Sequence, residues 1–165
     1  MEESGTIWDR FLTFESGRVK RRGRRRSAPE CGGMLRFPDP DPQGTADLVM
    51  TGRKTAFIWS MAKWLRLGLD IPRPGVYYLL PDGSGRACAV LRAGRAYMLP
   101  YREMTEELAV AEGLDSSLQA WQQRERALLM RETAETGAVF TLDAQLVALT
   151  FTLSYFERNG DDTES

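Results

Sequence analysis

At residues 46–57 the sequence reads ADLVMTGRKTAF, which predicts a helix, a glycine corner and a strand in direct succession. The first half is an apolar, amphipathic run, and Gly52 stands where a helix commonly ends. Residues from Lys54 to Trp59 then alternate as a strand does. A lysine at such a corner can direct its ammonium group into a cleft, where it binds a phosphate or, once desolvated, acts as a base. The alternative is a solvated lysine beside a capping glycine.

Outward from this corner, the pattern predicts a mixed order of helices and strands. A helical stripe covers residues 7–14 and ends at Gly17, a helix covers about 43–51, and a short helix or lid covers 60–67. The later elements are strands at 76–80, 87–91, 95–99 and 146–153, a hairpin turn at 81–85, and helices at about 103–112 and 116–135. The last strand is apolar on both faces and is therefore predicted to be central. We expect an α+β fold, with a small curved sheet or a PUA-like β-barrel flanked by helices, and not a Rossmann arrangement.

Composition excludes several kinds of chemistry. The 165 residues include no histidine, which rules out histidine triads, imidazole acid–base catalysis and histidine-ligated metals. Cys31 and Cys88 are too few for a zinc cage or a disulfide scaffold, and free thiols fit a reducing compartment. We therefore expect a cytoplasmic protein without metal or cofactor. No apolar run is long enough to cross a bilayer, and the acidic start is unlike a secretory signal.

Basic residues crowd one short segment near the N-terminus. Residues 18–26 hold Arg21, Arg22, Arg24, Arg25 and Arg26 among other cations, interrupted by Gly23. So dense a charge predicts a flexible arm that can attract RNA or DNA phosphates. A solvated linker, or a partner for the acidic residues 158–165, is the alternative. The expected organisation is thus an N-terminal helix and arm at 1–33, one domain at 34–157, and an acidic tail at 158–165.

Glu112 occupies an unusual position at the end of the helix predicted for 103–112. The helix dipole disfavours a carboxylate there, so the residue gains nothing locally and is a candidate for another role. An exposed glutamate in the last turn is the ordinary alternative.

Together these segments resemble the ASCH domain, a relative of the PUA-like β-barrels, over roughly residues 34–155. The resemblance rests on ADLVMTGRKTA at 46–56, PGVYYLL at 74–80 with its DGSG turn, AEG at 111–113, and Asp115, Ser117, Leu118 and Trp121. Residues 36–39, RFPD, resemble a partly altered version of the aromatic-Gly-Asp segment that often stands at the start of these domains. The resemblance implies a cleft near the Gly-x-Lys-Thr corner that binds RNA or nucleosides. Some members resemble ribonucleases, and one branch hydrolyses the acetyl amide of an acetylated cytidine.

The residues of that amidohydrolase branch match only in part. The resemblance makes Lys54 the base and Glu112 the third member of the set, but Phe57 stands at the position of the threonine nucleophile. Thr55 is a poor substitute because it lies on the opposite strand face from its neighbours. In the family's Trp-Arg-x-x-His segment, Trp121 is kept while Gln122 and Glu125 replace the arginine and the histidine. An amidase reaction is therefore not expected.

The family positions that do match, together with the nearby aromatic residues, favour a site that binds an anion or a nucleic-acid base. The candidate ligand-binding residues are Arg53, Lys54, Thr55, Phe57, Glu112, Trp121 and Gln122. Lys54 and Glu112 are expected within ion-pairing or water-bridged distance. Phe57, Trp59 and Trp64 are either core residues or a surface on which a base stacks beside a cation.

Three functions stay open on these grounds. The first is binding of RNA or a nucleoside-like ligand in a cleft around Lys54 and Glu112. The second is a metal-independent ribonuclease that uses the same two residues for catalysis. The third is a degenerate domain that acts as a protein-interaction module, which a filled cleft would favour.

Overall fold

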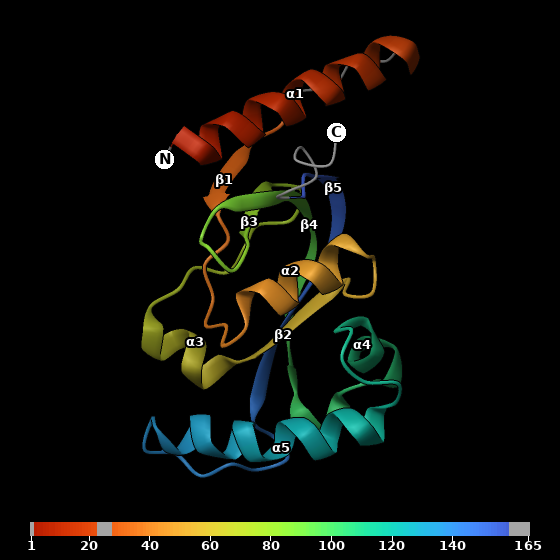
Figure 1. The fold of residues 1–165 in the computed structure, drawn as a ribbon. Helices are drawn as coiled ribbons and strands as arrows, with labels where there is room; N and C mark the ends of the chain where they lie inside the picture. The colour runs from red at the N-terminus through yellow and green to blue at the C-terminus, as the bar shows by residue number, and fades with distance from the viewer. Residues whose placement is uncertain (1, 23–27, 159–165) are drawn as a thin grey trace.

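A computed structural model describes residues 2–22 and 28–158 and shows helices on both faces of one open sheet (Figure 1). The helices are α1 (Glu2–Arg22), α2 (Pro42–Met50), α3 (Met61–Leu67), α4 (Glu106–Ala111) and α5 (Leu118–Ala134), with a 3-10 turn η1 (Tyr101–Glu103). The strands are β1 (Cys31–Met34), β2 (Ala56–Ser60), β3 (Tyr77–Pro81), β4 (Ala87–Pro100) and β5 (Gln145–Phe156). The α+β class expected from the sequence is confirmed.

The strands of the described chain form one sheet in the order β1-β3-β4-β5-β2. β1 pairs with β3 in parallel, and the other neighbours are antiparallel. The two edge strands, β1 and β2, do not pair with each other, so the sheet is open and the barrel alternative is wrong. β5 is internal, as its two apolar faces predicted.

β4 and β5 form a long two-stranded ribbon at the centre of the sheet. β4 pairs with β3 on one side and β5 pairs with β2 on the other. β4 runs without interruption from Ala87 to Pro100, where two separate strands were expected on either side of Gly94. A bulge between Ala93 and Ala96 replaces the expected break. A Cβ at Gly94 would lie 2.7 Å from Thr150 Oγ1 and 3.2 Å from Thr150 O, so β5 leaves no room for a side chain at this position of the bulge.

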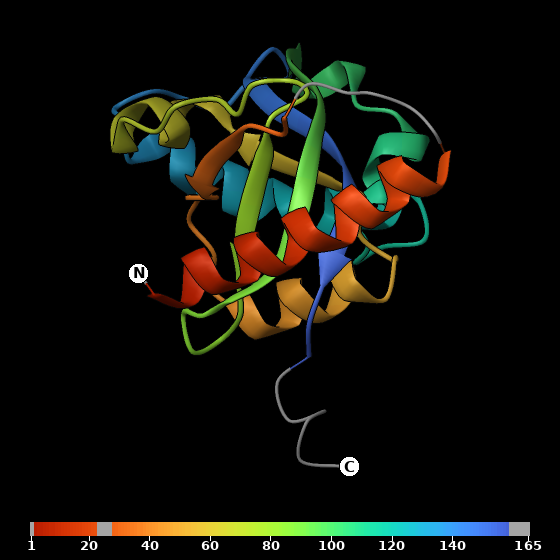
Figure 2. The ribbon, with the colours of Figure 1, turned by 90° about the horizontal axis from the view of Figure 1, so that it is seen from above.

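The helices divide between the two faces of the sheet. On one face, Val49 and Met50 of α2 pack on Leu91 and Leu149. On the other face, α4 and α5 cover the alternate residues Leu146 and Ala148 with a core that contains the buried Trp121. Also on this second face, at the opposite end of the sheet, α1 lies across β3 and β4 (Figure 2) and buries Ile7 and Phe11 against Tyr77, Leu79 and Val90.

The N-terminal region departs from the sequence prediction in two ways. α1 continues through Gly17 to Arg22, so the first part of the predicted arm is helical. An interior glycine costs a helix only about 1 kcal/mol, and the arginines and lysine beyond it are good helix formers. The region predicted as an N-terminal helix and arm also contains β1, which adds to the edge of β3 although its sequence, CGGM, carries no strand pattern. Arg24, Arg25, Arg26 and the tail from 159 onward lie outside the described residues.

Candidate ligand-binding groove

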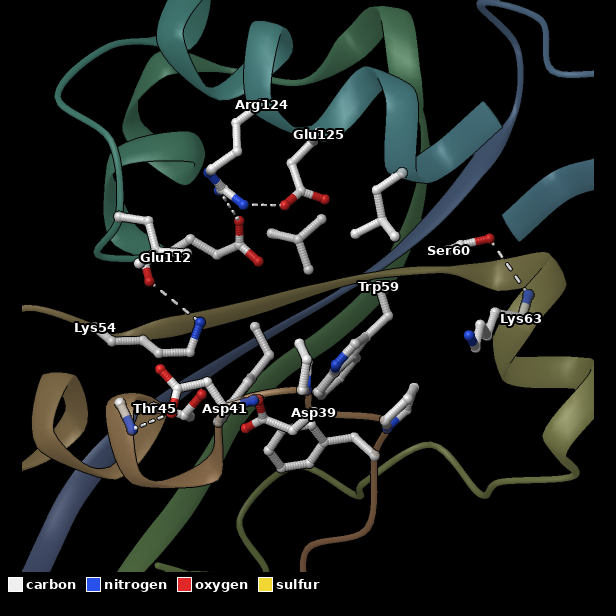
Figure 3. Close-up of a pocket in the computed structure, with 18 of the residues that line it drawn as sticks. Asp39, Asp41, Thr45, Lys54, Trp59, Ser60, Lys63, Glu112, Arg124 and Glu125 are labelled. Carbon is white, nitrogen blue, oxygen red and sulfur yellow. Dashed lines mark hydrogen bonds and ion pairs between the residues drawn. The ribbon is translucent and has the colours of Figure 1, made fainter. Parts of the chain in front are cut away.

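A groove of about 1040 Å³ runs along the edge strand β2 (Figure 3). Its walls are residues 37–41 and α2 on one side and α5 on the other, with α3 at one end and Glu112 at the other. Because β2 is an edge strand, side chains from both of its faces reach the groove: Phe57 and Trp59 from one, Ile58 from the other. The groove therefore borders the corner between α2 and β2 that contains Arg53 and Lys54.

Lys54 is held under this groove by its local structure. Gly52 adopts a φ of +81° after α2, which turns the chain toward β2. The Lys54 side chain is buried, with 6% of the residue exposed, and Nζ donates to the main-chain carbonyl of Glu112 at 3.2 Å. The ammonium also lies 4.6 Å from the centre of the Phe57 ring. Burial lowers the pKa of Lys54, and the nearby charges of Glu112 and Asp39 oppose that shift.

Glu112 meets Lys54 through its backbone rather than its carboxylate. Oε1 accepts a hydrogen bond from Trp121 Nε1 at 2.7 Å and lies 3.5 Å from Arg124 Nη2. None of the ion pairs among the described residues joins Lys54 to a carboxylate, and the contact between Lys54 and Glu112 is the hydrogen bond to the main-chain carbonyl. The two residues are still neighbours, as predicted, and Glu112 does serve something other than its own helix.

Aromatic rings form one continuous wall of the groove. The Phe57 and Trp59 rings, on the same face of β2, are 5.1 Å apart and nearly parallel, at 9°. Phe37 lies 4.9 Å from Phe57, and Trp64 lies 4.4 Å from Trp59. Trp64 is almost wholly buried and belongs to the core, whereas Trp59 is half-buried and faces the groove.

α5 presents a row of charged side chains to the same space. Arg124 donates to Asp115, at 2.7 Å, and to Glu125. Glu125 points from α5 into the groove (Figure 3), and burial, together with the carboxylate of Glu112, raises its pKa to about 7. Farther along, Lys63 Nζ lies 3.9 Å from Glu132 Oε2. The groove thus joins an aromatic wall to paired charges, which suits a planar polar ligand.

The structure places the sequence-predicted residues in three groups. Arg53, Lys54, Phe57 and Glu112 line the groove. Trp121 is wholly buried and acts behind the wall, because its indole holds Glu112. Thr55 is exposed and does not line the groove, and neither does Gln122.

Several groove residues were missed by sequence reasoning. Asp39 and Asp41 lie on the wall opposite α5 (Figure 3), and Asp41 caps α2 by accepting from Gly44 N at 3.1 Å. Asp41 before Pro42 is an N-terminal capping signal that could have been used. Arg124 and Lys63 were missed because nothing local marks which face of a helix borders a groove.

The comparisons with known proteins agree with this architecture. The family model described as "ASCH domain" matches residues 35–155. The chain belongs to the ASCH domain family. This family has a PUA-like fold that is often linked to RNA binding. No curated protein is similar enough in sequence to count as a relative.

Two solved structures show the same fold as this ASCH protein. An ASCH domain from Lactobacillus crispatus JV V101 superposes with a TM-score of 0.72 at 23% identity, covering 94% of this chain and 96% of that one. A DUF984-family protein from Enterococcus faecalis V583 gives a TM-score of 0.66 at 23% identity, covering 99% of this chain and 94% of that one. Among the described helices, none combines the length and the apolar character that a membrane span requires.

Proposed function

We propose that this ASCH protein binds RNA, or a nucleoside-like ligand, by taking one unstacked base into the groove along β2. The observation that carries the proposal is the pairing of Lys54 with the aromatic wall. Within the described residues, the buried ammonium group has one hydrogen-bond acceptor, the carbonyl of Glu112, and it lies over Phe57 next to Trp59. Lysine has three donors, so the others are available to a ligand.

The charges in the groove favour a base over a phosphate as the buried part of the ligand. Basic groups are balanced by acidic ones, Asp39, Asp41, Asp47, Glu112, Glu125, Glu132 and Glu135, which would repel a phosphate. Carboxylates and an ammonium group can instead hydrogen-bond to a base edge while the ring stacks on Trp59. The exposed Cys31 and the buried Cys88 are both free cysteines, which suits the cytoplasm, where RNA is encountered.

Catalysis by Lys54 has weaker support. The lowered pKa of Lys54 is the property that a general base needs. The Glu112 carboxylate, however, is already engaged by Trp121 and Arg124. An open groove of this size also argues against a module that only contacts proteins, since a filled cleft was expected in that case.

The test is the affinity for a short single-stranded RNA, measured by fluorescence anisotropy for the wild type and Lys54→Met. Methionine keeps the volume of the side chain and removes a charge whose burial is unfavourable, so we expect unchanged or higher thermal stability. Affinity should fall about tenfold, the loss typical of a charged hydrogen bond.

Arg95→Gln is the matched control, because Arg95 is exposed and lies outside the groove. Equal affinity of Lys54→Met and wild type would overturn the groove as the binding site. The length of the RNA after incubation separates binding from cleavage in the same samples. Shortened RNA with the wild type, and intact RNA with Lys54→Met, would establish the ribonuclease alternative.

A further inference from the structure

Glu125 is one of the carboxylates that line the groove. It sits on the groove-facing side of α5, and its side chain extends into the cavity between Arg124 and the aromatic wall (Figure 3). Only 12% of the side chain is exposed. A glutamate enclosed to this degree normally has partners for both of its oxygens.

Only one oxygen of Glu125 has a partner in the described protein. Arg124 Nη1 donates to Oε2, and no described residue donates to Oε1. Oε1 is also not among the fully buried, unpaired side-chain atoms, a group that contains only Trp64 Nε1 in the described part of the chain. It is therefore open to the groove, where it can accept a hydrogen bond from a ligand.

The surroundings of Glu125 make its ionised form energetically unfavourable. Besides Arg124, three charged groups act on Glu125. They are Glu112 at the end of α4, Glu132 farther along α5, and Lys54 across the groove. Two of these are carboxylates, and they add to the desolvation that disfavours its ionised form. A neutral glutamine would fit the same space at lower cost. Groups kept in an unfavourable state at a cavity wall are characteristic of functional sites.

We propose that Glu125 determines base specificity, by accepting a hydrogen bond at Oε1 from the amino group of a base stacked on Trp59. This inference rests on the proposed function and names the ligand more narrowly: a nucleoside whose base carries an exocyclic amine. Cytosine and adenine present an amino group on their pairing edges, whereas uracil and hypoxanthine present a carbonyl oxygen at the same place. A carboxylate oxygen repels that carbonyl oxygen and accepts from the amine.

The experiment compares nucleosides that differ only in this group. Cytidine and uridine, then adenosine and inosine, are titrated into wild type, Glu125→Gln and Glu103→Gln by calorimetry at about pH 8.5, where Glu125, with a pKa of about 7, is ionised. Glu103 is an exposed carboxylate outside the groove, so its substitution makes the same chemical change without touching the site. We expect the wild type and Glu103→Gln to bind the amino-bearing member of each pair about tenfold more tightly.

Glutamine both donates and accepts, so Glu125→Gln should bind both members of each pair with affinities within about twofold of each other. An undiminished preference in Glu125→Gln, or no preference in the wild type, would overturn the role of Glu125 while leaving the groove as a nucleoside site. Failure of the wild type to bind any of the four nucleosides, together with RNA binding insensitive to Lys54→Met, would overturn the proposed function itself.

Discussion

At the scale of single residues, the groove is defined by charges held beside apolar walls. Lys54 and Glu125 are both largely enclosed. Burial lowers the pKa of Lys54 and raises that of Glu125, and both shifts favour the neutral form of the side chain. Such groups lower the free energy of unfolding, and proteins commonly keep them where function requires them. Their energetic cost can be measured separately from their role in binding.

The cost of Glu125 should appear as a pH dependence. Its pKa is raised to about 7 in the folded protein, so the folded state binds more protons than the unfolded state between about pH 4.5 and 7. Its contribution to stability is therefore favourable at acid pH and is lost as pH rises through 7. We expect Glu125→Gln to be more stable than wild type at pH 8, by roughly 1–3 kcal/mol, and to show little difference near pH 4.5.

Urea unfolding followed by circular dichroism at several pH values measures this difference. Glu103→Gln should show no such trend, because Glu103 is exposed. A constant difference between Glu125→Gln and wild type across the pH range would mean that Glu125 is not protonated near neutrality.

At the scale of secondary-structure elements, the end of α4 fixes the corner between α2 and β2. Thr55 N donates to Ala111 O at 2.8 Å, and Lys54 Nζ donates to the next carbonyl, that of Glu112. Gly113 follows with a φ of +91°, and a Cβ there would lie 3.0 Å from both Arg53 O and Lys54 Cβ. The helix end and the corner are thus in direct contact at a position where only glycine fits.

Gly113→Ala should therefore impair both stability and binding. Gly137 provides the matched control, since its φ is +81° and nothing lies within 4 Å of the added Cβ. Gly137→Ala should cost about 1–2 kcal/mol, the strain of a left-handed residue. Gly113→Ala should cost about 1–3 kcal/mol more, because the added methyl group pushes Lys54 out of place.

Urea unfolding and RNA anisotropy measure the two effects, and only Gly113→Ala should weaken RNA binding. Equal stability and equal affinity of the two variants would show that the contact between α4 and the corner does not position Lys54.

The sequence predicts elements well where local signals and packing agree. The corner after α2, the α3 helix between Ser60 and Gly68, and the central place of β5 all follow from capping residues and apolar pattern. It fails where the deciding contact is distant. β1 forms because the edge of β3 offers hydrogen bonds, and β4 stays one strand because β5 runs beside its whole length. The same reason hides Glu125, whose importance depends on which face of α5 meets β2.

At the scale of the whole molecule, the described part separates a groove from a basic end of α1. Arg21 and Arg22 belong to the last turn of that helix, and Arg24, Arg25 and Arg26 follow it in sequence. We expect these residues to supply salt-sensitive affinity that does not depend on RNA sequence. Replacing all five with glutamine should flatten the slope of log affinity against log salt by roughly three units, since each phosphate neutralised on a single strand contributes about 0.7.

A variant with five other exposed arginines replaced by glutamine, Arg66, Arg92, Arg95, Arg102 and Arg126, controls for net charge. Fluorescence anisotropy across a salt series compares the two. The same slope in both variants would show that total charge, rather than the basic segment, attracts the RNA.

The internal position of β5 also sets an order of events during protein synthesis. β2 has no neighbour in the sheet except β5, and β5 is made after every other described strand. Until residues 146–150 have left the ribosome, β2 remains an unpaired apolar segment, exposed to chaperones and to other chains. The candidate groove is therefore the last part of the described fold that a nascent chain can assemble, and a shortened translation product lacking β5 would retain Lys54 without the groove around it.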